Sequence, residues 1–325
     1  MTSRDSELTE KIGTVGVLLG GCSRERAISL RSGQAVYRAL KDAGFRVARI
    51  DTANGYQKKL MHEKIQFAFP VLHGRGGEDG TIQRDLKKSN IPFVGSEPLA
   101  SACAFNKIRA KRRFKASGIP TPKYHVITSR NRKRVLGKWQ LPFVIKPVCE
   151  GSSIDVRIYD SFRPKARELT KLLRLYDELL IEERITGKEL TVGVLGKKAL
   201  PVVEVRPKRS FYDFKSKYTK GLTTYLVPAR IPNVLRRRLQ SIALRVHQAL
   251  GLMDFSRVDF MVDQRGRPYV LEVNSIPGFT ETSLLPKAAA QIGLSFNDLC
   301  VELLQLAYRR QIADRSGKRN GASKK

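Results

Sequence analysis

The chain has 325 residues, 41% of them hydrophobic, which is long for a single core and comfortable for two or three packed domains. No apolar run approaches the length of a membrane-spanning helix, and the opening residues MTSRDSELTE lack the apolar centre of a signal peptide. We therefore expect a soluble cytoplasmic protein without membrane insertion. Its cysteines, Cys22, Cys103, Cys149 and Cys300, are far apart in sequence, so neither a zinc site nor a disulfide framework is indicated.

The charge is strongly positive, because 61 Lys and Arg against 30 Asp and Glu give a formal net charge of +31. Such a balance often marks a nucleic-acid partner. Here the basic residues are scattered, and no aromatic residues interleave with them as in RNA-binding motifs. We expect a generally basic surface that attracts anionic substrates, and no specific nucleic-acid partner. Residues 313–325, rich in Gly, Ser, Lys and Arg, predict a disordered basic tail.

The first hundred residues alternate between strand and helix patterns. The expected elements are a buried strand at Thr14–Leu19, a tight loop at 20–23, a helix at 28–43 and strands at 45–50 and 67–72. This order predicts a doubly wound α/β domain whose ligands bind at the strand ends. The Gly-Gly loop does not match the G-x-G-x-x-G fingerprint, so we expect no NAD site.

After residue 104 the pattern changes to a mixture of helices and antiparallel strands. The expected elements are a basic helix at 105–116, strands at 142–147 and 178–182, a hairpin of 190–195 with 200–205, a helix at 234–251, and a C-terminal helix near 297–307. A Gly-Ser-Ser loop follows the strand at 142–147. We expect α/β and α+β modules in series.

The segment 257–274 is the most informative, because apolar and polar residues alternate with period 2 on both sides of a turn at 263–266. Such alternation predicts a hairpin with one polar face. The polar groups on this face include Arg257, Asp259, Glu272 and Asn274. Two carboxylates and an amide oxygen are hard ligands suited to Mg²⁺. A wet polar face with a surface ion pair is the alternative that these residues alone leave open.

The register of this hairpin depends on the length of its turn. A four-residue turn would pair Val262 with Arg267. Asp259 would then lie opposite Val270, and Glu272 would be its diagonal neighbour on the same face.

Five motifs in order carry a family resemblance. They are LGGCSRER at 19–26, HGRGGEDG at 73–80, KPVCEGSS at 146–153, YDFKSKY at 212–218, and EVNSIPGFT at 272–280 with Ser283 and Leu284. Together they resemble the D-alanine:D-alanine ligases of the ATP-grasp superfamily, over residues 12 to 308. The resemblance implies an N-terminal doubly wound parallel-sheet domain followed by a two-module ATP-grasp fold. The implied divisions are 1–104, 105–190, 191–312 with the metal site, and the tail 313–325.

The resemblance also implies a reaction. Such enzymes join two D-alanines for peptidoglycan synthesis: one carboxylate attacks the γ-phosphate of ATP, and the amine of the second D-alanine displaces phosphate from the acyl phosphate. Both steps concentrate negative charge, so the site needs cations and N–H donors.

The ATP-binding residues follow from the resemblance position by position. Two lysines would bind phosphates, a loop would close over them, acids and an apolar residue would meet adenine and ribose, and a further lysine would reach the transferring phosphate. The two phosphate lysines are Lys107 and Lys146, and the closing loop contributes Glu150 and Ser153. The adenine and ribose residues are Glu182, Glu183, Ile185 and Glu189, and the further lysine is Lys217. Taken alone, Lys107 fits a solvated basic face and Glu182 a surface acid. Lys146 ends an apolar strand, where an idle charge is costly.

The catalytic and amino-acid positions also follow from the resemblance. Asp259, Glu272 and Asn274 would hold Mg²⁺ or Mn²⁺, as two ions, with Arg257 and the Gly278 N–H stabilising the oxyanion. Glu25 would bind the ammonium group of the first D-alanine and join Ser152 and Tyr218 in a hydrogen-bonded triad. Ser283 and the Leu284 N–H would bind the second carboxylate, and His73 would lie near the second amino group.

The chain departs from the family pattern at Asp155, where the family usually has glycine. A carboxylate beside a phosphate-binding loop repels ATP unless a cation such as Arg157 compensates. Tyr218 is of the kind found in enzymes that add D-alanine rather than D-lactate. The alternatives are a D-lactate or D-serine ligase, another ATP-grasp carboxylate-amine ligase, and a noncatalytic nucleic-acid-binding relative. We also expect a homodimer.

Overall fold

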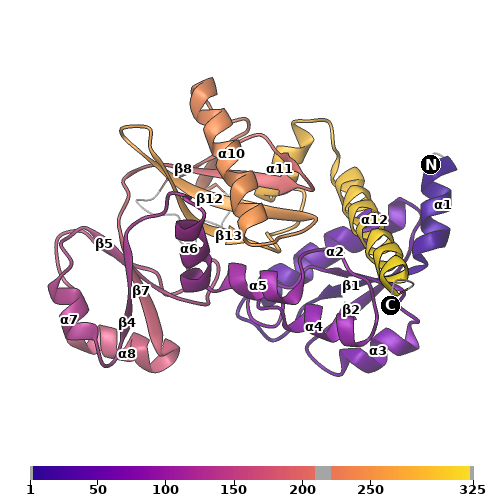
Figure 1. Ribbon diagram of the computed structural model, residues 1–325, viewed down its shortest axis with the longest axis horizontal. Coiled ribbons are helices and arrows are strands. Elements are labelled where there is room, and N and C mark those ends of the chain that lie inside the picture. Colours follow the sequence, from indigo (N-terminus) through magenta and orange to yellow (C-terminus); the bar gives the residue numbers. More distant parts are fainter. Residues whose placement is uncertain (1–2, 209–220, 323–325) are drawn as a thin grey trace.

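The computed structural model describes residues 3–208 and 221–322, with side chains from 8 to 208 and from 221 to 312. Figure 1 shows the N-terminal domain and helix α12 (Phe296–Ala322) at one end of the molecule and a module with helices α7 (Arg132–Gly137) and α8 (Ala166–Tyr176) at the other. A third module, with helix α10 (Asn233–Ala249), lies between them. None of the helices in the described part of the chain has the length and apolar character needed to cross a bilayer.

The N-terminal domain contains a parallel sheet in the order β2-β1-β3. Its elements are α1 (Ser3–Ile12), β1 (Thr14–Leu19), α2 (Arg26–Asp42), β2 (Arg46–Asp51), α3 (Tyr56–His62), β3 (Phe67–Pro70), α4 (Thr81–Lys88) and α5 (Pro98–Phe105). Alternate residues of β1 enter two cores: Val17 packs with α2, and Leu18 packs with α3 and α4. Helices therefore cover both faces, and the expected doubly wound arrangement is confirmed.

Helix α12 returns the chain to the N-terminal domain. Its buried Leu299 and Leu303 lie in the same core as Val36 and Leu40 of α2. The helix continues to Ala322, through most of the segment for which a disordered tail was expected. Once tertiary packing has formed the first turns, each further residue adds a hydrogen bond without a new nucleation cost. Composition alone gave no sign of this extension.

The central module is a four-stranded antiparallel sheet in the order β4-β7-β5-β6. Its strands are β4 (Tyr124–Thr128), β5 (Phe143–Pro147), β6 (Arg157–Tyr159) and β7 (Glu178–Glu183). Helices α7 and α8 cover one face, where Phe143, Ile145, Leu172 and Ile181 form a core. Lys146 follows this buried stretch, so its side chain is held by a rigid strand.

The C-terminal module is a larger antiparallel sheet in the order β11-β10-β8-β12-β13, with β9 paired to β8. Its elements are β8 (Gly187–Leu195), β9 (Lys198–Ala199), β10 (Val203–Pro207), β11 (Thr223–Leu226), α10, β12 (Phe255–Asp263), β13 (Pro268–Asn274) and α11 (Leu284–Ala290). Helix α6 (Lys107–Ala116) packs its Ala110 and Phe114 into the core of this module. Strand β8 begins at Gly187, so the division expected at 190/191 falls inside a strand of this sheet.

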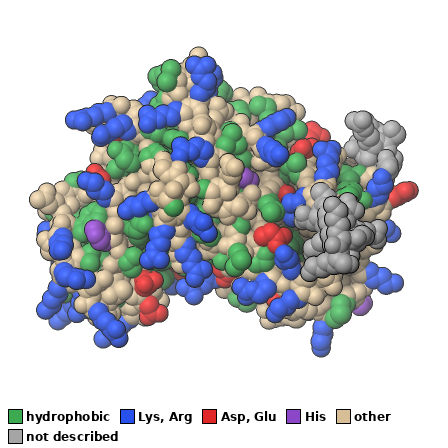
Figure 2. All heavy atoms as spheres, in the orientation of Figure 1, with side chains coloured by type: hydrophobic (Ala, Val, Ile, Leu, Met, Phe, Trp, Pro, Cys, Tyr) green, Lys and Arg blue, Asp and Glu red, His purple; other side chains and the backbone are tan. Residues whose placement is uncertain are grey.

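The two antiparallel modules that follow a doubly wound domain form the expected ATP-grasp fold. Figure 2 shows Lys and Arg side chains spread over all three parts of the visible face rather than gathered over one element. This distribution agrees with a generally basic surface.

Candidate active site

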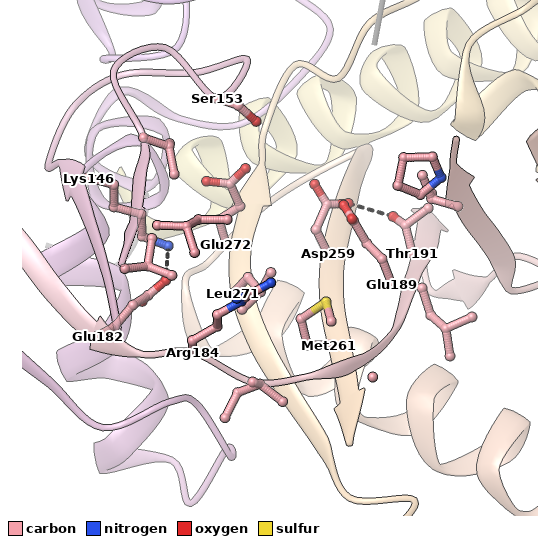
Figure 3. A pocket seen from close by; sticks show the side chains of 18 of the residues that line it. Lys146, Ser153, Glu182, Arg184, Glu189, Thr191, Asp259, Met261, Leu271 and Glu272 are labelled. Carbon is pink, nitrogen blue, oxygen red and sulfur yellow. Dashed lines mark hydrogen bonds and ion pairs between the residues drawn. The ribbon is translucent and has the colours of Figure 1, made fainter. Parts of the chain in front are cut away.

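Two adjoining cavities lie between the modules. The larger, about 440 Å³, is lined by the central and C-terminal sheets (Figure 3). The smaller, about 340 Å³, is lined by the N-terminal domain, the loop after β5 and the segment after β13. Arg257, Glu272 and Leu284 line both cavities. The expected metal and oxyanion residues therefore stand where the two cavities meet.

The hairpin of β12 and β13 differs in register from the expected one. Val262 pairs with Pro268 rather than Arg267, because the turn is one residue longer. A β-bulge after Asp259 then leaves Leu271 unpaired and brings Glu272 directly opposite Asp259. The expectation of a shared face holds, but the carboxylates are direct rather than diagonal neighbours.

Asp259 is held by three side chains. Arg257 donates from Nε and Nη2 to its two carboxylate oxygens, each at 2.8 Å. Thr191 of β8 donates to Oδ1 at 2.6 Å, and Asn274 Nδ2 donates to Oδ2 at 3.0 Å. Figure 3 shows Asp259 and Glu272 projecting into the larger cavity from the neighbouring strands. Thr191 was not anticipated from the sequence, where it was one polar residue in an apolar strand.

The phosphate lysines are buried and paired with acids. Lys107 Nζ lies 3.4 Å from Glu272 Oε2 and donates to the Glu150 carbonyl at 2.5 Å. Lys146 Nζ lies 2.5 Å from Glu182 Oε1, as the dashed line in Figure 3 marks. Glu182 is only 3% exposed, so it is neither a surface acid nor a solvated residue. The solvated-face alternative for Lys107, which is 7% exposed, is likewise wrong.

Lys111 is a fully buried cation that the sequence did not distinguish from its basic neighbours. Its Nζ lies 3.0 Å from Glu182 Oε2 and 2.7 Å from Thr121 Oγ1. Burial lowers the pKa of Lys111 to about 8, against the opposing pull of Glu182. Burial alone would raise the pKa of Glu182, but Lys111 and Lys146 outweigh it and hold that pKa below its usual value. The acid therefore stays ionised between two lysines.

The remaining ATP-binding candidates line the same larger cavity. They are Glu150, Ser153, Glu183, Ile185 and Glu189. The Glu183 N–H already donates to the Lys123 carbonyl at 2.9 Å. Buried Glu204 of β10 also lines this cavity and accepts from Arg206 Nε at 2.8 Å. It was missed because an acid near the end of a strand has no distinguishing motif.

The smaller cavity joins the first domain to the loop between β5 and β6, residues 148–156, called the β5–β6 loop below. Ser152 Oγ donates to Glu25 Oε1 across this junction. A Cβ placed on Gly151 would lie 2.7 Å from Glu25 Oε2, so only glycine allows this approach without a shift. Two members of the expected triad are therefore together. Tyr218, the third, and Lys217 lie outside the described residues.

His73 is neutral and fixed between two segments. Burial lowers its pKa to about 4. Because a carbonyl can only accept, Nδ1 donates to the Ile276 carbonyl at 3.1 Å and Nε2 accepts from Ser32 at 3.2 Å. The ring lines the smaller cavity, where the resemblance places it.

Glu78 is a further buried acid of the smaller cavity, and its place in the HGRGGEDG motif was its only sequence signal. It accepts from the Gly74 N–H at 2.9 Å. Burial raises the pKa of Glu78 to about 8, and the neighbouring Glu25 adds to the rise.

Gly278, Ser283 and Leu284 also line the smaller cavity. Ser283 precedes α11, and its Oγ accepts from the Thr280 N–H at 3.0 Å. The loop 275–283 thereby brings a hydroxyl and backbone N–H groups to the cavity that Glu25 and His73 also line.

Asp155 does not line the larger cavity, although Ser153, Ile154 and Val156 do. Its carboxylate accepts from Tyr176 OH, from Arg24 Nη1 at 3.3 Å and from Arg157 Nη2 at 3.3 Å. The compensation by Arg157 is therefore present, together with a second arginine. No repulsion of a triphosphate follows from this geometry.

Sequence comparison identifies the family. A profile described as D-ala D-ala ligase C-terminus matches residues 114–305, and one described as D-ala D-ala ligase N-terminus matches residues 49–96. The chain belongs to the D-alanine–D-alanine ligase family. Among curated relatives, the D-alanine–D-alanine ligase of Syntrophotalea carbinolica is 44% identical over 306 residues, covering 94% of this chain and 99% of the relative. That of Aquifex aeolicus is 42% identical over 287 residues, covering 88% and 97%.

Solved structures of the family share the fold of this ligase. The D-alanine–D-alanine ligase of Bacillus anthracis superposes with a TM-score of 0.81 at 32% identity, covering 93% of this chain and 99% of the other. VanG D-Ala:D-Ser ligase from Enterococcus faecalis gives a TM-score of 0.77 at 30% identity, covering 91% and 99%. A complex of the B. anthracis enzyme with ATP also matches, with a TM-score of 0.77.

Proposed function

We propose that this ligase joins two D-alanines to D-alanyl-D-alanine with hydrolysis of ATP to ADP and phosphate, for peptidoglycan synthesis. The observation that carries the proposal is the position of Arg257 and Glu272, which line both cavities. A group transferred from a nucleotide in the larger cavity to an amino acid in the smaller one would pass these residues. Family membership supports the same assignment.

On the nucleotide side, Lys107 and Lys146 bind phosphate oxygens. Each is paired with a carboxylate, Lys107 with Glu272 and Lys146 with the buried Glu182, so each ammonium group is positioned before the ligand arrives. Glu150 and Ser153 close over the phosphates, Lys217 reaches the transferring phosphate, and the segment from Glu182 through Ile185 meets the adenine. Glu189 takes the ribose hydroxyls. Positioned charges in a site sheltered from water stabilise the developing negative charge most effectively.

On the amino-acid side, Glu25 binds the ammonium group of the first D-alanine, and Ser152 and Tyr218 order the loop above it. Ser283 and the Leu284 N–H bind the carboxylate of the second D-alanine, while His73 lies near its amino group. Arg257 and the Gly278 N–H stabilise the oxyanion of the tetrahedral intermediate. The neutral state of His73 supports a positioning role for it rather than a cationic one.

The donor set fits magnesium or manganese. Asp259 and Glu272 face each other across the β12–β13 pair, and Asn274 adds an amide on the same face. Within the described part of the chain no group of three His, Cys, Asp or Glu side chains forms a metal cluster. Besides the two carboxylates, the amide oxygen of Asn274 and oxygens of the bound phosphates would hold the metal. Mg²⁺ would supply charge neutralisation of the phosphates there, as two ions. In the structure, Arg257 holds the carboxylate of Asp259 in place, and Lys107 holds that of Glu272.

The test is phosphate release from ATP with a panel of acceptors. The full chain with Mg²⁺ and ATP is offered D-alanine alone, then D-alanine with D-serine or D-lactate, and products are identified by mass spectrometry. We expect D-alanyl-D-alanine as the dominant product. Absence of any dipeptide at millimolar D-alanine, with ATP bound, would contradict the proposal.

A D-alanine:D-serine ligase is the second candidate, because the VanG structure covers 91% of this chain. The same panel separates it, since a D-serine ligase would give the mixed dipeptide when both amino acids are present. A product that contains D-lactate would identify a D-alanine:D-lactate ligase instead.

We further infer a homodimer and a cytoplasmic location. Leu99 on α5 is 87% exposed, and a contact between N-terminal domains at this position would bury its apolar side chain. All four cysteines are free, which suits a reducing compartment. Light scattering after size exclusion tests the dimer, and replacement of Leu99 by Lys should shift the chain to monomer.

A further inference from the structure

The β5–β6 loop is held to the first domain at two points. The first is the hydrogen bond from Ser152 to Glu25. The second is a cluster of Arg24, Asp155 and Tyr176, called the Asp155 cluster below. Arg24 Nη1 lies 3.3 Å from both Asp155 Oδ2 and Tyr176 OH, and Tyr176 OH donates to the same Oδ2. The cluster thus joins three segments: the loop before α2, the β5–β6 loop and the end of α8.

The two points of attachment have opposite polarity. At the first, the acid is on the N-terminal domain and the donor is on the loop. At the second, the acid is on the loop and the donor, Arg24, is on the N-terminal domain. Since Arg24 directly precedes Glu25, a movement of the β5–β6 loop away from this segment breaks both contacts together.

The backbone of the loop requires such attachment. Ser152, Ser153 and Asp155 have φ angles of 50°, 58° and 55°, in the left-handed region that strains residues other than glycine. A loop of this conformation persists only where tertiary contacts over-determine it. Asp tolerates this region better than most residues, so Asp155 can supply a carboxylate at a position where the family usually has glycine.

We propose that Arg24 and Asp155 are positioning residues that hold the β5–β6 loop closed over the site, with Tyr176 as their anchor on α8. This inference rests on the proposed function of the loop in covering ATP phosphates. Through the loop, the cluster sets the position of Ser152 against Glu25 and of Ser153 at the nucleotide cavity. It acts on substrate binding rather than on the chemical step, because none of its three side chains lines either cavity.

The expected size of the effect follows from the exposure of the groups. A hydrogen bond to a charged group contributes about ten-fold or more to an equilibrium constant. Asp155 is 22% exposed and Arg24 58%, so solvent screening reduces that value. We expect the Asp155 cluster to raise the equilibrium constant for closure of the β5–β6 loop about five-fold.

The test uses the full chain and the variants Asp155→Asn, Asp155→Gly, Tyr176→Phe and Arg24→Ala. Hydrogen exchange of the peptide that contains residues 150–156 should be about five-fold faster in each variant without ligand. The Michaelis constants for ATP and D-alanine should rise about five-fold while kcat changes less than two-fold. Combining Arg24→Ala with Asp155→Asn should give about the effect of one change, because both remove the same contact.

Arg157→Ala is the matched control, since Arg157 contacts Asp155 from the neighbouring strand and does not reach the first domain. It should leave exchange and Michaelis constants within two-fold of the wild type. Asp155→Gly restores the glycine backbone, so faster exchange in both Asp155→Gly and Asp155→Asn assigns the effect to the carboxylate.

Unchanged exchange in the Asp155 and Tyr176 variants would overturn the proposal, as would additive effects of Arg24→Ala and Asp155→Asn. A fall in kcat at constant Michaelis constants would also overturn it. Exchange is measured without substrates, so its outcome stands even if the wild-type chain forms no dipeptide, which would be a failure of the proposed function instead.

Discussion

The buried lysine on α6 provides a direct test of how the nucleotide side of the site is held. Lys111 is 0% exposed, and the Lys111→Met change keeps an unbranched side chain but removes the ammonium group 3.0 Å from Glu182 Oε2. Removing one partner of a buried ion pair costs about 3–5 kcal/mol, because the remaining charge is left uncompensated. Glu182 keeps Lys146 at 2.5 Å, so we expect the lower end of that range, a loss of about 3 kcal/mol in the free energy of unfolding.

Urea unfolding followed by far-UV circular dichroism measures this loss. Lys115→Met is the matched control, since Lys115 is exposed on the same helix and its Nζ lies 4.6 Å from the Tyr124 ring centroid. An exposed cation–π contact contributes about 1 kcal/mol or less, so the control should change stability little. A loss below about 1 kcal/mol in Lys111→Met would show that the buried acid does not need its second cation, and would refute the reasoning.

Three further predictions concern the site and its pH dependence. Glu272→Gln should abolish turnover with the circular dichroism spectrum unchanged, because it removes one carboxylate of the metal set; activity near wild type at limiting Mg²⁺ would exclude this site. Arg257→Ala should lower kcat by about 10²-fold or more, and an effect on the Michaelis constant alone would contradict an oxyanion role. Burial lowers the pKa of both His73 and His247 from 6.5 to about 4, so the unfolded chain takes up protons first as pH falls. Each neutral histidine contributes about 3 kcal/mol to the free energy of unfolding above pH 6.5, and this contribution is lost as the pH falls towards 4. In urea unfolding, the free energy of unfolding of His247→Gln should therefore fall by about 3 kcal/mol less than that of the wild type between these pH values. An unchanged pH dependence would contradict the prediction.

The polar face of the hairpin was predictable from sequence, whereas its register was not. Period-2 alternation fixes which side chains share a face, so Asp259, Glu272 and Asn274 could be grouped in advance. The longer turn is held locally, because the Asp263 carboxylate accepts from the N–H groups of Arg265 and Arg267. The bulge at Leu271 has no local residue pattern that announces it.

The burial of individual charged side chains also could not be predicted from the sequence. Lys107 and Lys111 lie in one basic helix and share its composition, yet both are buried, whereas Arg109 and Arg112 on the same helix are exposed. The difference arises because one face of α6 meets β7 and β13, which the chain reaches only after residue 177. Helical spacing alone suggests a shared face for residues four apart, but it does not say what covers that face.

The site forms from contacts between segments that are distant in the chain. Ser152 reaches Glu25 across 127 residues, Thr121 Oγ1 donates to the Val270 carbonyl across 149, and His73 meets the Ile276 carbonyl across 203. The first and the last of these contacts lie at the smaller cavity. The ordered motifs could identify Glu25, Ser152, His73 and Ile276, because each of these residues lies in one of them. The pairing itself follows from the way the three modules pack, and that packing brings Arg257 and Glu272 to the junction of the two cavities.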